Sequence, residues 1–297
     1  MSLTHHLNNT ESLIFKWFNS KLNRATLDLA AHHNQIMSQK NIDPIPQGVN
    51  YLLLGTAVSY ALRHQIQPLI DVMVQTPAYT GATILNSANK FTTILALCGK
   101  SHEEKALAYL LLASLESVAC GNRPEDFVFF FFKNGCTLPI NKFEEGKYAP
   151  TVEDLINLIE SNQNMLETLD LKSKNAVLNP TFAGSSSLGG ADAQLIVDGN
   201  LLDIRTTKSS KPFTVKNFWQ QLAYVLLDWN DEYEIQTISW YYTRQKSYFS
   251  YEVNDMFTDL QSTREEFKEV CKQIDKEKHL FLDEKSRREA WPTILPY

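Results

Sequence analysis

Asp192 and Asp203 are the two acidic residues whose surroundings could support catalysis. They lie in two short apolar runs of the stretch GGADAQLIVDGNLLDIRTTK (189–208), which an Asp-Gly-Asn segment joins. Arg205 follows two positions after the second aspartate. An isolated carboxylate is costly to bury. Two of them beside a cation therefore predict a paired or metal-bound arrangement.

The alternation of side chains along the two runs predicts a β-hairpin. A two-residue turn at Asp198-Gly199 or at Gly199-Asn200 would pair even positions with odd positions across the strands. Asp192 would then share one face with Asp203 and Arg205. A three-residue loop would break this alignment, because a shift of one residue turns every side chain to the other face.

Two carboxylates on one face repel each other unless a divalent cation lies between them. Oxygen ligands suit Mg²⁺ or Mn²⁺, and the guanidinium of Arg205 could balance the charge of a phosphate. This combination predicts metal-assisted hydrolysis of a phosphodiester. The alternative is an exposed hairpin face that carries a cross-strand Asp–Arg ion pair.

The hairpin and the segment after it resemble a known enzyme family. GGADAQLIVDGNLLDIRTTK is similar to the catalytic hairpin of the PD-(D/E)XK nuclease superfamily, in which an Asp on one strand precedes an acid-x-Lys triplet on the next. Gln220 and Tyr224 in QQLAY resemble the QxxxY motif of the RecB-like branch. Their spacing places both side chains on one face of a helix.

The resemblance implies a Mg²⁺- or Mn²⁺-dependent nuclease, a hydrolase acting on DNA or on another nucleic acid. Asp192 and Asp203 would hold the metal ion. Gln220 and Tyr224 would position the nucleic acid or the strand of the active site.

The chain departs from the family pattern at two positions. Arg205 stands where the family has lysine, and arginine does not exchange a proton at ordinary pH. Lys208 could substitute for that lysine, but it has the wrong strand parity unless a bulge turns it. In GTAVSYALR, which resembles an upstream RecB-like segment starting at Gly55, Ser59 stands where a His is usual. These departures keep open a nuclease-fold protein that binds nucleic acid, or acts as a regulator or adaptor, without cutting.

Such a site also requires an acid from an earlier helix. Glu153, Asp154, Glu160 and Glu167 precede the hairpin, and the sequence does not select among them.

The composition is that of an ordinary soluble protein. The chain has 297 residues, of which 43% are hydrophobic and 21% charged, and its net charge is -6. No apolar run approaches the ~20 residues of a membrane span, and the N-terminus does not resemble a secretory signal. We therefore expect a cytoplasmic protein without membrane contact. The four cysteines show no metal-binding spacing, so we expect reduced thiols, mostly buried.

The predicted fold class is α/β (α+β), a small mixed sheet whose central hairpin is Ala191–Thr206, flanked by helices. We expect a single domain over 1–297. Residues 1–175 would be mostly helical, 176–258 would form the nuclease core, and 259–297 the C-terminal helix. Ser101 with Glu104 is a capping box with Gly121 as a helix stop, and Thr151 is a possible N-cap. The segment 216–230 is an amphipathic helix, of which 220–228 should pack on the sheet.

Further side chains could contact nucleic acid. Four cations surround the predicted site and could contact backbone phosphates: Arg205, Lys208, Lys211 and Lys216. A later aromatic run followed by two cations could stack bases: Trp240, Tyr241, Tyr242, Arg244 and Lys246. Packing in the core is the competing interpretation of these rings. The adjacent pairs His5-His6 and His32-His33 point in different directions on a helix and do not form a metal site.

Overall fold

The computed structural model describes residues 2–47, 50–69, 71, 76–136, 146–169 and 175–289 of the chain. In the described part of the chain before residue 175, helices form the regular structure, as the apolar spacing predicted. They are α1 (Leu3–Asn8), α2 (Leu13–Lys21), α3 (Asn23–Met37), α4 (Tyr51–Ile66), α5 (Pro77–Ile84), the short η2 (Ala88–Lys90), α6 (Phe91–Leu97), α7 (His102–Ala119), α8 (Asp126–Lys133), α10 (Ala149–Ser161) and α11 (Met165–Thr168).

The two ends of α7 follow the rules that its sequence predicted. The Ser101 hydroxyl accepts the backbone N–H of Glu104, and the Glu104 carboxylate accepts the N–H of Ser101, so the capping box is confirmed. Gly121 ends the helix with a φ of 87°, a left-handed conformation that glycine adopts without strain. The start of α10 was predicted wrongly: Tyr148 is its N-cap, and Thr151 lies buried inside the helix.

Among the described residues, five strands form one mixed sheet in the order β1-β2-β3-β4-β5. The strands β1, β2 and β3 are antiparallel neighbours, β4 runs parallel to β3, and β5 returns antiparallel to β4. Their bounds are β1 (Ala176–Leu178), β2 (Leu195–Val197), β3 (Asn200–Arg205), β4 (Thr237–Tyr242) and β5 (Ser247–Glu252), with a short helix η3 (Ser185–Leu188) between β1 and β2. The mixed sheet confirms the predicted fold class, although β1 was not foreseen.

The hairpin is shorter on its first strand than the sequence predicted. Asp198 and Gly199 form its two-residue turn, both with positive φ, which is one of the two predicted turns. The ladder extends only as far as the pair Leu195–Leu202. Asp192 forms a separate bridge with Thr181 instead, so the predicted strand from Ala191 is wrong.

The side chain of Gln194 explains why the two strands separate. Its Oε1 accepts the backbone N–H of Ile204 at 3.0 Å and the hydroxyl of Ser59 at 3.1 Å. A side chain therefore satisfies the Ile204 donor where the neighbouring strand would otherwise do so. The chain before Leu195 is free to turn away from β3.

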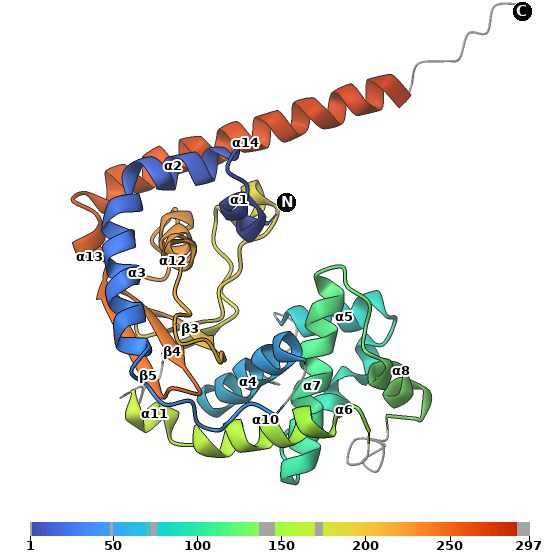
Figure 1. Ribbon diagram of the computed structural model, residues 1–297. Coiled ribbons are helices and arrows are strands. Elements are labelled where there is room, and N and C mark those ends of the chain that lie inside the picture. The colour runs from blue at the N-terminus through green and yellow to red at the C-terminus, as the bar shows by residue number, and fades with distance from the viewer. Residues whose placement is uncertain are drawn as a thin grey trace, which may run out of the picture.

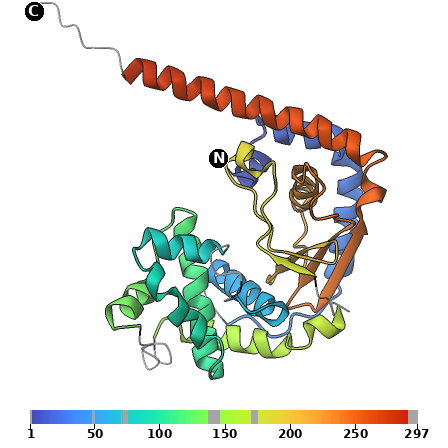
Figure 2. The same cartoon turned by 180° about the vertical axis from the view of Figure 1, so that it is seen from behind.

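The two faces of the sheet belong to two cores. Leu202 and Ile204 of β3 pack with α4, α7 and α10 in what we call the lobe core. Leu201 packs on the opposite face in what we call the α12 core, named after α12 (Val215–Leu227). Figures 1 and 2 show α12 on one side of the sheet and α4 with α10 on the other.

The helix α12 covers most of the predicted 216–230 segment, but it begins one residue earlier, at Val215, and ends at Leu227. Phe218 packs against Trp240 of β4 with ring centroids 4.9 Å apart. The chain continues through α13 (Val253–Met256) to the predicted charged helix α14 (Leu260–Glu289), which extends beyond the rest of the fold in Figure 1. Among the described residues, none of the helices combines the length and apolar character that crossing a bilayer requires.

Candidate functional site

A cavity of about 450 Å³ lies between α4, α12 and the end of β3. Five of the six predicted site residues line it: Asp192, Asp203, Arg205, Gln220 and Tyr224. Gly55 and Ser59 of the upstream segment also line it. The structure thus brings together residues that come from three separate stretches of the sequence.

Asp203 and Arg205 form an ion pair on the face of β3 that looks toward α12. The guanidinium approaches the carboxylate through Nε and Nη2, each 2.6 Å from the same oxygen, Oδ2. The pair is largely shielded, since the Asp203 side chain is only 12% exposed. Asp203, which was expected to hold a metal ion, is therefore paired with the guanidinium of Arg205.

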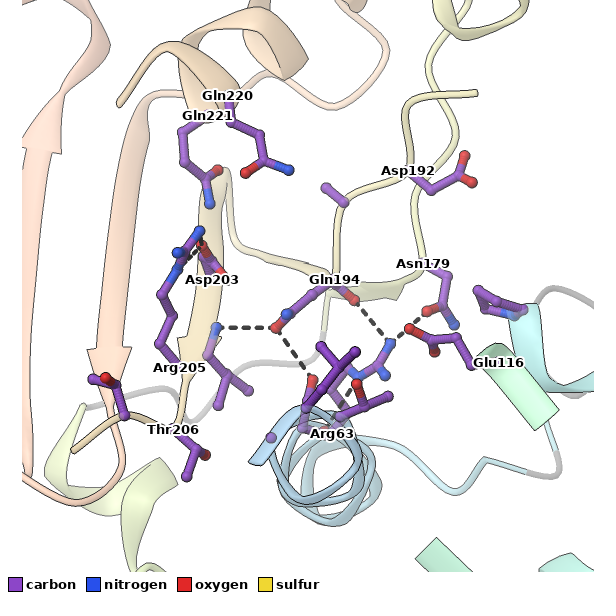
Figure 3. A pocket seen from close by; sticks show the side chains of 18 of the residues that line it. Arg63, Glu116, Asn179, Asp192, Gln194, Asp203, Arg205, Thr206, Gln220 and Gln221 are labelled. Atoms are coloured by element: carbon purple, nitrogen blue, oxygen red, sulfur yellow. Dashed lines mark hydrogen bonds and ion pairs between the residues drawn. The ribbon is translucent and has the colours of Figure 1, made fainter. Parts of the chain in front are cut away.

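Asp192 approaches the cavity from the irregular segment before β2. In Figure 3 its carboxylate points away from Asp203, which follows from the separation of the two strands. It opens to solvent on one side, and burial by the surrounding walls raises its pKa. Asp192 and Asp203 share one cavity, but they are not the adjacent pair that a longer hairpin would have produced.

Gln220 and Tyr224 interact on one face of α12, as their spacing predicted. The Gln220 amide donates to the Tyr224 hydroxyl at 3.0 Å, and the Tyr224 ring stacks on Phe182. Burial raises the pKa of Tyr224, so its hydroxyl stays protonated and can donate a hydrogen bond. Gln220 lies above Asp203 in Figure 3, and Tyr224 lines the same cavity.

Lys208 lies at the rim of the cavity and does not line it. Its ammonium donates to the Tyr51 hydroxyl at 3.1 Å and lies over the Tyr51 ring, while Tyr51 itself lines the cavity. Lys211 is exposed, and Lys216 donates to Asn8. The four predicted cations therefore do not form one cluster: Arg205 lines the cavity, Lys208 lies at its rim, and the other two lie elsewhere.

Arg63 is a cavity residue that the sequence reasoning missed. It is 2% exposed and donates to the backbone oxygens of Ser59 and Gln194 and to the side-chain oxygen of Asn179. Within the described ranges, no carboxylate lies at ion-pair distance from it. Its position one helical turn after Ser59 is a signal that could have identified it.

Two further polar groups in the cavity lack partners. The Asn179 side-chain amide nitrogen and the Gln221 side-chain oxygen are buried without a hydrogen bond in the described structure. Both residues line the cavity. Buried polar atoms without partners are unfavourable, so both groups would gain from a polar ligand.

The upstream acid of the cavity is Glu116 of α7, which the sequence reasoning did not consider. Figure 3 shows its carboxylate beside Arg63 and Asn179. Of the four predicted candidates, Asp154 is buried against Arg244 at 2.7 Å and Glu160 pairs with His102 at 2.8 Å. None of the four lines the cavity. No local pattern in the sequence distinguishes Glu116 from other helical acids.

The aromatic run of β4 is part of the core. Trp240, Tyr241 and Tyr242 are 0%, 3% and 0% exposed, so they cannot stack bases. Arg244 is buried with Asp154, and Lys246 pairs with Asp43. Core packing was the competing interpretation of these rings, and burial decides in its favour.

The cavity meets part of what a divalent metal ion requires. Asp192, Asp203 and Glu116 supply the carboxylate oxygens that Mg²⁺ and Mn²⁺ prefer. However, across the described residues, no three His, Cys, Asp or Glu side chains are grouped closely enough to hold a metal ion. Binding of a metal ion by these acids would require Arg205 to release Asp203 and Asp192 to turn toward Asp203.

The described cysteines form no disulfide: Cys98 and Cys271 are buried, Cys136 is intermediate and Cys120 is exposed.

Comparisons of this chain with protein-family models, with curated proteins and with solved structures found no match.

Proposed function

We propose that this protein is a metal-dependent nuclease that hydrolyses phosphodiester bonds of DNA. The observation that carries the proposal is the single cavity that contains three acids, two arginines and the Gln220–Tyr224 pair. Acids that bind metal and cations that bind phosphate are the two requirements for this chemistry. The family resemblance of the hairpin and of α12 points to the same reaction.

Each group has a proposed role. Asp203 and Asp192 would hold Mg²⁺ or Mn²⁺, with Glu116 as a further oxygen ligand. The bound ion would polarise the phosphate and lower the pKa of a water molecule. Arg205 or Lys208 would support the phosphate or the water, and Gln220 and Tyr224 would position the nucleic acid.

A second candidate is a nuclease-fold protein that binds nucleic acid without cutting it. The Arg205–Asp203 ion pair favours this reading, because binding of a metal ion must compete with an existing cation. The direction of Asp192 in Figure 3, away from Asp203, favours it as well.

A cleavage assay separates the two candidates. Wild-type protein is incubated with end-labelled single- and double-stranded DNA and with Mg²⁺, Mn²⁺ or EDTA. Asp203→Asn removes the charge inside the cavity. Asp198→Asn makes the same chemical change at the exposed turn, where asparagine tolerates the positive φ, and it serves as the matched control.

Metal-dependent cutting that Asp203→Asn abolishes and Asp198→Asn preserves would support the nuclease. Salt-sensitive DNA binding without cutting would support the second candidate. Absence of both binding and cutting would contradict both.

A further inference from the structure

A second cavity, of about 410 Å³, lies in the helical lobe between α4, α7 and α10. It shares no lining residue with the first cavity, and the nuclease proposal makes no use of it. Its volume falls within the range of small-molecule sites in proteins, roughly 300–1,000 Å³.

Its walls are largely apolar and aromatic. Ile156 and Ile159 of α10 line one side, and Tyr109 of α7 lies on another. The His64 ring meets the Tyr109 ring edge-on, with centroids 6.0 Å apart. Flat apolar surfaces of this kind suit a planar ring system.

Two polar atoms in the lining have no hydrogen-bond partner among the described residues. His64 Nδ1 and Gln65 Oε1 are buried without a hydrogen bond in the described structure. The Gln65 oxygen only accepts, so it requires a donor from a ligand. His64 Nδ1 can accept or donate, depending on its tautomer.

Lys105 gives the cavity a positive charge. Glu160, the acid in the lining, contacts His102 Nδ1 at 2.8 Å, which is an ion pair when His102 is protonated. Within the described ranges, no carboxylate lies at ion-pair distance from Lys105. The Lys105 charge also helps to lower the pKa of His64, after burial as the main cause.

We propose that this cavity is a binding site for a small heteroaromatic anion. Its acidic group would pair with Lys105, a ring N–H would donate to Gln65, and its planar body would lie between Tyr109 and the two isoleucines. This inference does not depend on the nuclease proposal.

Indole-3-acetate is a suitable probe, because it combines a planar ring, a ring N–H and a carboxylate. Binding to the full-length protein would be measured by isothermal titration calorimetry, with an expected Kd of about 1 mM or tighter for a ligand of this size. Naphthalene-1-acetate lacks the N–H and tryptophol lacks the charge. Both should bind several times more weakly.

Three variants test the assignment of the site. Lys105→Gln should weaken binding of indole-3-acetate by about tenfold or more, as loss of a charged hydrogen bond does. Lys100→Gln makes the same change at a neighbouring lysine outside the lining and should leave binding unchanged. Ile159→Trp should fill the cavity and abolish binding, with circular dichroism confirming that the variant is folded. No binding of indole-3-acetate, or binding that ignores both Lys105→Gln and Ile159→Trp, would overturn the proposal.

Discussion

Arg205 donates both Nε and Nη2 to a single oxygen of Asp203, with each distance 2.6 Å. The two residues lie on the same face of β3 at alternate positions, so the strand itself maintains the contact. The ion pair places a fixed positive charge where the nuclease proposal requires a metal ion.

Arg205→Lys should therefore increase the affinity for Mn²⁺. Lysine keeps the charge but loses the two-pronged contact, and it can leave Asp203 more easily. A change of about tenfold is expected, since hydrogen bonds to charged groups contribute about 1.5–3 kcal/mol. Calorimetric titration with MnCl₂ measures it. Arg264→Lys, at the Arg264–Asp231 pair outside the cavity, is the control. Unchanged or weaker Mn²⁺ binding in Arg205→Lys would show that the ion pair does not compete with the metal.

Arg63→Gln should weaken DNA binding in the absence of metal. Arg63 is a buried cation in the cavity. A phosphate could contact its guanidinium directly, whereas the Glu116 carboxylate lies beside it without forming a described ion pair. Fluorescence anisotropy in EDTA should show a loss of about tenfold and a shallower salt dependence, by about one unit of slope. Arg24→Gln, an exposed arginine outside the cavity, should change neither. A folded Arg63→Gln variant with wild-type affinity would exclude Arg63 from the DNA-binding surface.

His33 should make the protein less stable in acid. Burial is the main reason that its pKa falls to about 3, and the nearby His32 adds to the effect. The ring is stacked between Phe213 and Phe249. In the unfolded chain, His33 binds a proton near pH 6.5. The stability that depends on the neutral His33 ring is therefore complete above that pH and is lost as pH falls toward 3. Over this range the free energy of unfolding should fall by about 1.4 kcal/mol for each pH unit.

Urea denaturation between pH 7 and pH 4.5 measures this effect. His33→Leu should remove this part of the pH dependence, and its apolar side chain suits the pocket, because both His33 nitrogens lack partners in the described structure. His5→Leu, at an exposed histidine, should leave the slope as in wild type. Equal slopes in wild type and His33→Leu would mean that His33 is protonated in the folded protein.

Gly81→Ala should severely destabilise the helical lobe. A Cβ at this position would stand 1.8 Å from the backbone oxygen of Leu115, so α5 and α7 would have to move apart. We expect a loss of about 3 kcal/mol or more, visible as a lower midpoint of urea unfolding. Gly99→Ala, where the nearest atom would be 3.8 Å away, is the matched control. A Gly81→Ala variant as stable as Gly99→Ala would show that the two helices are not this close.

Local rules explain what the sequence predicted correctly. The capping box of α7, the Asp198-Gly199 turn and the spacing of Gln220 and Tyr224 each depend on neighbouring residues only. The strand alternation correctly placed Asp203 and Arg205 on one face, because that pattern is also local.

The parts that the sequence did not predict depend on contacts between distant segments. The hairpin separates after Leu195 because Gln194 bonds to Ser59 of α4 as well as to Ile204. Glu116 and Arg63 reach the cavity only because α7 and α4 pack below the sheet. The sequence pattern did not distinguish Asp154 from solvent-facing helical acids, because its buried partner Arg244 is ninety residues away in the chain.

The strand β3 contributes to both cores, with Leu202 and Ile204 on one side and Leu201 on the other. A backbone shared in this way couples the two halves of the fold, because neither core can lose this strand without exposing the other. We therefore expect the amides of β3 to exchange hydrogen only through global unfolding. The cavity beside this strand is then assembled by the same cooperative event that folds the whole chain, and a partly folded intermediate would contain no functional site.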